Sequence, residues 1–96
     1  GLKAYTQYVV QAAAYPDIDE AESLRERLQA RFPQSPVIID MASNGFFAVV
    51  AGPFDEESQA RQLSRQLQRD GITNLVRRCH RFSFIVSAPM LLSCFL

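Results

Sequence analysis

An uninterrupted run of six apolar residues, 46–51, is followed by a Gly-Pro pair and a phenylalanine. A short apolar run that ends in turn residues is typical of a strand buried on both faces. Asn44-Gly45 before the run favours a tight reversal of the chain. Asp55, Glu56 and Glu57 after it suit the N-terminus of a helix. The stretch is therefore predicted to form the middle of a strand–turn–helix unit.

This unit occurs twice, at an offset of 39 residues that aligns residues 8–15 with residues 47–54 without a gap. The same offset pairs Ala21 with Ala60, Leu24 with Leu63, and Leu28 with Leu67. An internal repeat predicts a fold with two similar halves. The alternative is a chance match between amphipathic helices, which share alanine and leucine.

Apolar residues that recur every three or four positions predict two amphipathic helices. The first has Ile18, Ala21, Leu24 and Leu28 on one face, closes at Phe32 and is stopped by the prolines that follow. The second uses the repeat-related residues of the first and ends at Asp70-Gly71, where glycine can adopt the left-handed cap conformation.

Strands are predicted at residues 8–14, 37–40, 46–54 and 72–78, after a short lead-in at residues 1–7. The order β-α-β-β-α-β predicts an α+β, ferredoxin-like fold with a four-stranded antiparallel sheet. Each helix has a single apolar stripe, so both helices are expected to cover the same sheet face. The other face is left for solvent, a ligand or a partner.

Side chains alternate between the two faces of a strand. Gln11 is the polar residue of the first strand, so its side is expected to be the open one, together with Val9 and Ala13. The repeat then assigns Ala48 and Val50 to the open face, with Phe46 in the same parity. The residues expected under the helices are Tyr8, Val10, Ala12, Phe47, Val49 and Ala51. Either Arg77 or Arg78, but not both, is expected to reach the open face.

Composition narrows the class of protein. Ninety-six residues, 48% of them hydrophobic, suit one small globular domain. Ten basic and ten acidic residues cancel, so net charge gives no indication of nucleic acid or anionic membrane as a partner. The spacing of Cys79 and Cys94 suits no metal site; they form a disulfide or remain two thiols. His80 is the single histidine, and no catalytic grouping, metal site or cofactor motif is expected.

We divide the chain into a domain at residues 1–78 and a hydrophobic C-terminal extension at residues 79–96. Residues 82–96 are fewer than the roughly 20 that a membrane helix needs, and Pro89 interrupts them. The extension either adds to the sheet, covers the open face or docks on another subunit. The chain starts at Gly1, and we expect it to be part of a longer protein.

Several stretches together resemble the SPOR (sporulation-related repeat) domain. They are the strand Tyr8-Val9-Val10-Gln11, the aromatic Tyr15, the stretch from Phe46 to the Gly52-Pro53-Phe54 turn, the doubled Ala/Leu helices and Gly71. The resemblance covers residues 7–78. It implies a bacterial domain of the periplasm or cell envelope that binds peptidoglycan glycan strands lacking stem peptides, as found at division sites.

The resemblance also implies a binding site on the open sheet face. It points to Gln11 and Phe46 as contact residues, above a floor formed by Val9, Ala13, Ala48 and Val50. The family usually has glycine at the position of Ala13. A glutamine amide can donate to and accept from sugar hydroxyl and acetamido groups, and an aromatic ring can hold the apolar face of a sugar. The alternatives are a solvated strand residue for Gln11 and burial under the hairpin or the extension for Phe46.

The resulting prediction is a non-catalytic module that binds peptidoglycan, needs no cofactor and reaches a membrane only through missing parts of a longer protein. The main alternative is a SPOR-like domain for protein–protein assembly in an envelope complex, because an apolar open face is more typical of a protein interface than of a sugar groove. An RNA-binding RRM shares the element order. However, Asn44 replaces its basic residue, and the central strand offers Ala48 and Val50 at the next outward positions.

Overall fold

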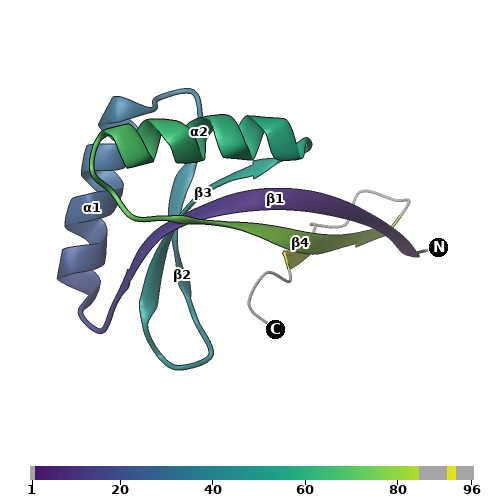
Figure 1. Cartoon of the computed structure of the whole chain (residues 1–96). Helices are drawn as coiled ribbons and strands as arrows, with labels where there is room; N and C mark the ends of the chain where they lie inside the picture. The colour runs from purple at the N-terminus through teal and green to yellow at the C-terminus, as the bar shows by residue number, and fades with distance from the viewer. Residues whose placement is uncertain (1, 85–90, 93–96) are drawn as a thin grey trace.

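The computed structural model describes the backbone of residues 2–84 and 91–92, and the side chains of residues 5–80. In chain order the elements are β1 (Leu2–Tyr15), α1 (Ile18–Arg31), β2 (Val37–Met41), β3 (Phe47–Phe54), α2 (Glu57–Arg69), β4 (Leu75–Phe84) and β5 (Leu91–Leu92). The antiparallel sheet has the strand order β2-β3-β1-β4-β5 (Figure 1). The predicted α+β fold is confirmed, with β5 as a short fifth strand.

β1 and β4 are longer than predicted and extend together beyond the helices (Figure 1). Leu2–Gln7 pair with Cys79–Phe84, while β3 joins β1 only from Tyr8 onward. The prediction of residues 1–7 as a lead-in is therefore wrong for residues 2–7, because their backbone pairs with β4 in the sheet. β4 also continues without a break past residue 78, the predicted end of the domain.

Side-chain caps begin both helices. Asp17 accepts a hydrogen bond from the backbone N–H of Asp19 at 3.0 Å, and Glu56 and Gln59 form a reciprocal capping box at the start of α2. Gly71, with φ of 78°, follows the end of α2 as expected. Ile18 does not join the buried face predicted for it: its side chain is 43% exposed, because it lies in the first turn of α1.

The main core lies between the helices and one face of the sheet. Its buried members are Val10, Ala12, Ala21, Leu24, Leu28, Val37, Val49, Ala51, Ala60, Leu63 and Leu67. Tyr8 and Phe47 are partly buried against it. The residues predicted to lie under the helices are therefore all in this core or packed against it. The apolar stripes of α1 and α2 explain this packing, because each helix buries only one side.

The central pair, β1 and β3, carries an irregularity at Gly52. Tyr8 pairs with Phe54 and Val10 with Ala51, so two residues of β3 lie opposite the single residue Val9. Gly52 has φ of 122°, and a Cβ atom added to it would lie 3.2 Å from the carbonyl oxygen of Tyr8. Only glycine allows both this conformation and this close approach of the two backbones.

We predict that Gly52→Ala lowers the free energy of unfolding by about 2–3 kcal/mol, because the new methyl group meets backbone at a strained φ. Gly45→Ala is the matched control: Gly45 also has a positive φ, of 85°, but an added Cβ would meet nothing within 4 Å. Its expected cost is about 1 kcal/mol. Urea unfolding of both variants tests this, and equal losses would show that the contact with Tyr8 is unimportant.

Candidate functional site: the sheet face opposite the helices

A row of four side chains crosses the sheet on the side away from the helices. Register pairs Ile38 of β2 with Val50 of β3, Val50 with Gln11 of β1, and Gln11 with Leu75 of β4. Two residues before Gln11 on β1, Val9 pairs with Arg77 in the backbone register. Gln11 therefore lies near the centre of this face, as the alternation predicted. We call this surface, on the side of the sheet opposite the helices, the sheet face.

The floor of the sheet face is buried rather than bare. Val9, Ala48, Val50 and Cys79 form a second apolar cluster, with Ala14 packed against it, and none of the four is more than 1% exposed. Val9, Ala48 and Val50 thus lie on the predicted side, but the expectation of an open apolar patch there is wrong. At 0–1% exposure these side chains offer almost no surface to a ligand.

Ala13 does not belong to this floor. Ala13 packs against the core under the helices. Ala14 instead packs against the second cluster, on the side of the sheet that was predicted for Ala13. The cause is a register shift in β1, since Gln11 pairs with Val50 but Ala13 pairs with Val49. One extra residue in a strand reverses the alternation beyond it. The placement of Ala13 on the open face was therefore wrong.

Phe46 lies at the end of the β2–β3 turn, one residue before β3 begins. Its backbone N–H donates to Oδ1 of Asn44 at 3.0 Å, and its carbonyl oxygen accepts from the N–H of Ala42 at 2.8 Å. The side chain is 39% exposed and belongs to neither apolar cluster. It is therefore a hairpin residue outside both cores.

The central polar contact of the sheet face joins Gln11 to Arg77. Nη1 of Arg77 donates to Oε1 of Gln11 at 3.2 Å, and both side chains are half-buried. The contact links β1 to β4 across 66 residues of sequence and fixes the orientation of the Gln11 amide. With Oε1 accepting from Arg77, the amide nitrogen of Gln11 carries the two N–H donors of this side chain. Of the two candidate arginines, Arg77 is the one on this face, while Arg78 pairs with Tyr8 of the helix side.

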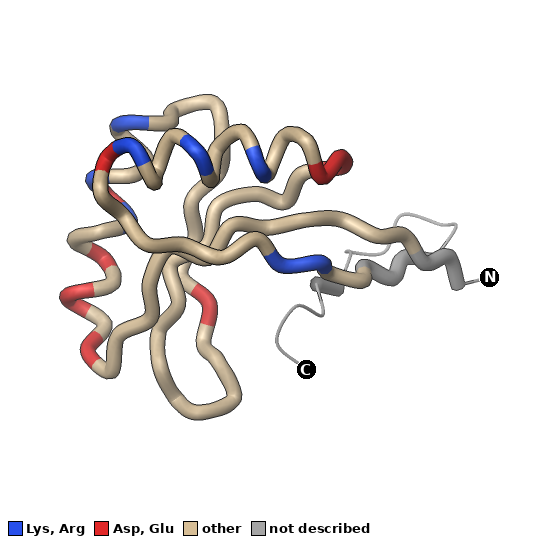
Figure 2. The backbone as a smooth tube through the Cα atoms, viewed as in Figure 1, with Lys and Arg blue, Asp and Glu red and all other residues tan. Residues whose placement is uncertain are grey.

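Apolar side chains flank the Gln11–Arg77 pair at both ends of the row. Ile38 is 42% exposed and Leu75 is 58% exposed. The basic stretch of β4 lies alongside β1 (Figure 2), and Asp40 belongs to β2, the strand at the opposite edge of the sheet. Sequence reasoning did not identify Ile38 and Leu75, and left Arg77 undecided. The signal that finds them is the strand register, which requires the bulge positions to be known.

Cys79 lies in the buried cluster and is disulfide-bonded. The sequence left open whether Cys79 forms a disulfide or remains a thiol, and the structure shows the disulfide. Cys94 lies outside the described residues. The predictions for the extension beyond residue 84 also fall outside the described residues, except for the two-residue pairing of β5 with β4.

The described residues contain no cluster of three or more histidine, cysteine or acidic side chains that could hold a metal ion. Among the helices described, none is long and apolar enough to cross a membrane. His80 is exposed on β4. The described side chains of the sheet face offer hydrogen bonding, the positive charge of Arg77 and apolar contact, which suit binding.

Comparison with protein families matches residues 4–78 to the SPOR domain. The chain belongs to the SPOR domain family. Comparison with solved structures finds a similar structure, the solution structure of the peptidoglycan-binding domain of the B. subtilis cell wall lytic enzyme CwlC. The TM-score is 0.66 at 23% identity, over 77% of this chain and 90% of that one, which establishes a shared fold. Comparison with curated protein sequences finds no match.

We predict that Val50→Ala lowers the free energy of unfolding by about 2 kcal/mol, the cost typical of a truncated core residue, because its side chain is 1% exposed. Ile38→Ala removes a larger side chain from the paired position, but a partly exposed one, and should cost less. Chemical denaturation of this SPOR domain measures both. A smaller loss for Val50→Ala than for Ile38→Ala would show that the second cluster is not a true core.

Proposed function

We propose that this SPOR domain is a non-catalytic module that binds peptidoglycan glycan strands lacking stem peptides, on the sheet face. The observation that carries the proposal is the Gln11–Arg77 pair, which presents fixed polar groups at the centre of that face. Membership of the family and the fold shared with a peptidoglycan-binding domain support it. We further propose that the domain acts in the bacterial cell envelope and helps to recruit a longer protein to division sites.

Gln11 has the donor and acceptor groups that a glycan requires. Its Oε1 accepts from Arg77, and its two N–H groups can donate to a hydroxyl or to the carbonyl of an acetamido group. An amide held in one orientation loses less side-chain entropy on binding. Gln11 is therefore proposed as the residue that recognises the sugar.

Arg77 is proposed to distinguish bare strands from strands that carry stem peptides. Cleavage of the amide bond between a stem peptide and its sugar leaves a carboxylate on the sugar. A guanidinium has five donors and binds carboxylates with good geometry, so Arg77, which donates to Gln11 through Nη1, is the type of residue that suits this group. A strand with an intact amide at that position lacks the negative charge.

Ile38 and Leu75 are proposed to border the glycan. Sugar rings have apolar C–H faces, and partly exposed aliphatic side chains on either side of a polar centre can pack against them. The same two residues support a second candidate function, protein–protein assembly through the sheet face, because exposed apolar side chains of this size are common at interfaces.

The test is sedimentation with purified peptidoglycan sacculi, with and without prior amidase treatment. We predict that the 96-residue chain binds amidase-treated sacculi more tightly, and that Gln11→Ala weakens this binding about tenfold, as expected for the loss of one or two hydrogen bonds. Arg77→Gln should weaken binding to amidase-treated sacculi more than binding to untreated sacculi, so that the preference for treated sacculi falls.

Gln68→Ala is the matched control, because Gln68 is an exposed glutamine on α2, away from the sheet face. Circular dichroism establishes that each variant is folded. Failure of the folded parent chain to bind either type of sacculus would contradict the glycan proposal. Self-association that is lost in Ile38→Asp and Leu75→Asp would then support assembly.

A further inference from the structure

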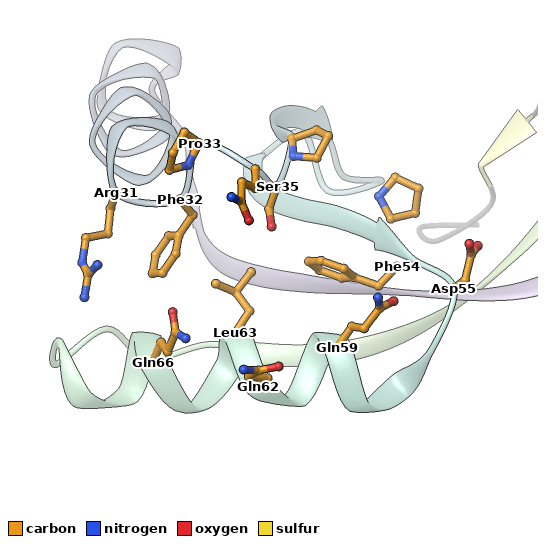
Figure 3. Close-up of a pocket in the computed structure, with 13 residues that line it drawn as sticks. Arg31, Phe32, Pro33, Ser35, Phe54, Asp55, Gln59, Gln62, Leu63 and Gln66 are labelled. Atoms are coloured by element: carbon orange, nitrogen blue, oxygen red, sulfur yellow. The ribbon is translucent and has the colours of Figure 1, made fainter.

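A groove lies on the helix side of the molecule, remote from the sheet face. It is formed by the C-terminal end of α1 with the following loop, the end of β3 and one side of α2 (Figure 3). Its volume is about 660 Å³, within the range of sites that hold small ligands. The function proposed above makes no use of it.

The floor of the groove is aromatic and aliphatic. Phe32 and Phe54 are both half-buried and project toward the same space, with Leu63 of α2 between them (Figure 3). The guanidinium carbon of Arg31 lies 5.2 Å from the centroid of the Phe32 ring. Two ring surfaces at the base of a groove suit a ligand with flat apolar faces.

Amide side chains form one wall. Gln59, Gln62 and Gln66 follow one another along α2 at spacings of three and four, and all three line the groove (Figure 3). Gln59 is used by the capping box of α2. Within the described part of the chain, the amides of Gln62 and Gln66 have no hydrogen-bond partner. Each can offer a donor and an acceptor to a ligand.

The charged groups at the rim are already engaged. Arg31 forms an ion pair with Asp70 at 3.4 Å, and Asp55 accepts a hydrogen bond from Nε2 of Gln7 at 2.6 Å. The wall that faces the floor therefore offers neutral amides. This disfavours phosphate-bearing or strongly acidic ligands and favours an uncharged polar one.

The opposite wall is pre-formed by Gln29. Its Nε2 donates to the carbonyl oxygens of Phe32 and Ser35, and its Oε1 accepts from the N–H of Val37, at 3.0–3.2 Å. The N–H of Gly52 also donates to the carbonyl oxygen of Pro36 at 2.9 Å, which ties the loop to β3. A groove whose walls are held by such contacts loses little entropy when a ligand binds.

We propose that this amide groove is a second saccharide site, which takes an uncharged sugar unit carrying hydroxyl and acetamido groups. The sugar ring lies on Phe32 and Phe54, and its polar substituents exchange hydrogen bonds with Gln62 and Gln66. The proposal goes beyond the binding of bare strands on the sheet face, because it concerns the other side of the molecule and a different set of residues.

The test is an NMR titration of the ¹⁵N-labelled 96-residue chain with N-acetylglucosamine tetrasaccharide. The expected result is shifts of the Gln62 and Gln66 side-chain amides and of the backbone around Phe32. The double variant Gln62→Ala/Gln66→Ala should bind about tenfold more weakly at these positions, and Gln68→Ala should leave the affinity unchanged. Both glutamines are at least partly exposed, so the variants should fold, and their spectra check this.

Two further probes separate the sources of the ligand. Amidase-treated soluble glycan fragments that shift the same signals identify peptidoglycan as one source, and a stem peptide alone should leave these signals unchanged. The proposal is overturned when the tetrasaccharide shifts no groove signal, when the double variant binds as tightly as the parent, or when only the stem peptide shifts the groove. Signals of Gln11 and Arg77 report on the sheet face, so the two proposals fail separately.

Discussion

The structure depends on the burial of β1 and β3 on both of their faces. Val10 and Val49 are fully buried toward the helices, and Val9 and Val50 are buried, at most 1% exposed, on the opposite side. The two helices and the neighbouring strands are positioned by this pair, since α1 and α2 cover one face and β2 and β4 flank its edges. Because the centre of the sheet is core on both sides, polar function is confined to the positions around it, where Gln11 and Arg77 lie.

Much of this arrangement could be predicted from the sequence. The repeat follows from direct alignment of the two halves of the sequence. The helical stripes follow from a period of 3.6 residues and the residues under the helices from a period of two, and both periods depend only on local geometry. The placement of Ala13 failed because the period of two holds only while the strand is regular. A bulge is set by the pairing of two distant strands, and the residues of β1 alone carry no signal of it. The prediction of a strand buried on both faces holds for Val50, whereas the assignment of Val9 and Val50 to an open face does not predict their burial, because exposure depends on all neighbours in space.

The repeat accounts for the two register shifts together. One lies between Gln11 and Ala13 of β1, and the other is opposite Val9, at Gly52 and Pro53 of β3. The 39-residue offset aligns Ala13 with Gly52. The two halves therefore interrupt their strands at nearby positions of the repeat, and an interruption of this kind re-aims the side chains beyond it. In the second half the interruption requires glycine, because the carbonyl of Tyr8 lies against it. In the first half a position that packs against the helix-side core accommodates alanine.

The sheet face and the amide groove lie on opposite sides of the sheet, and this constrains how they can act together. Among the described residues, Gln11 of one site and Gln66 of the other share no hydrogen-bond partner. Each substitution should therefore change the binding free energy of a short saccharide at its own site only, and the two changes should add. On an intact sacculus the outcome differs, because a domain held on one strand meets the next at a high effective concentration. A single strand would have to pass around the edge of the sheet to fill both sites. Two sites placed in this way are suited to joining neighbouring strands, which would make retention on the sacculus much stronger than either affinity alone.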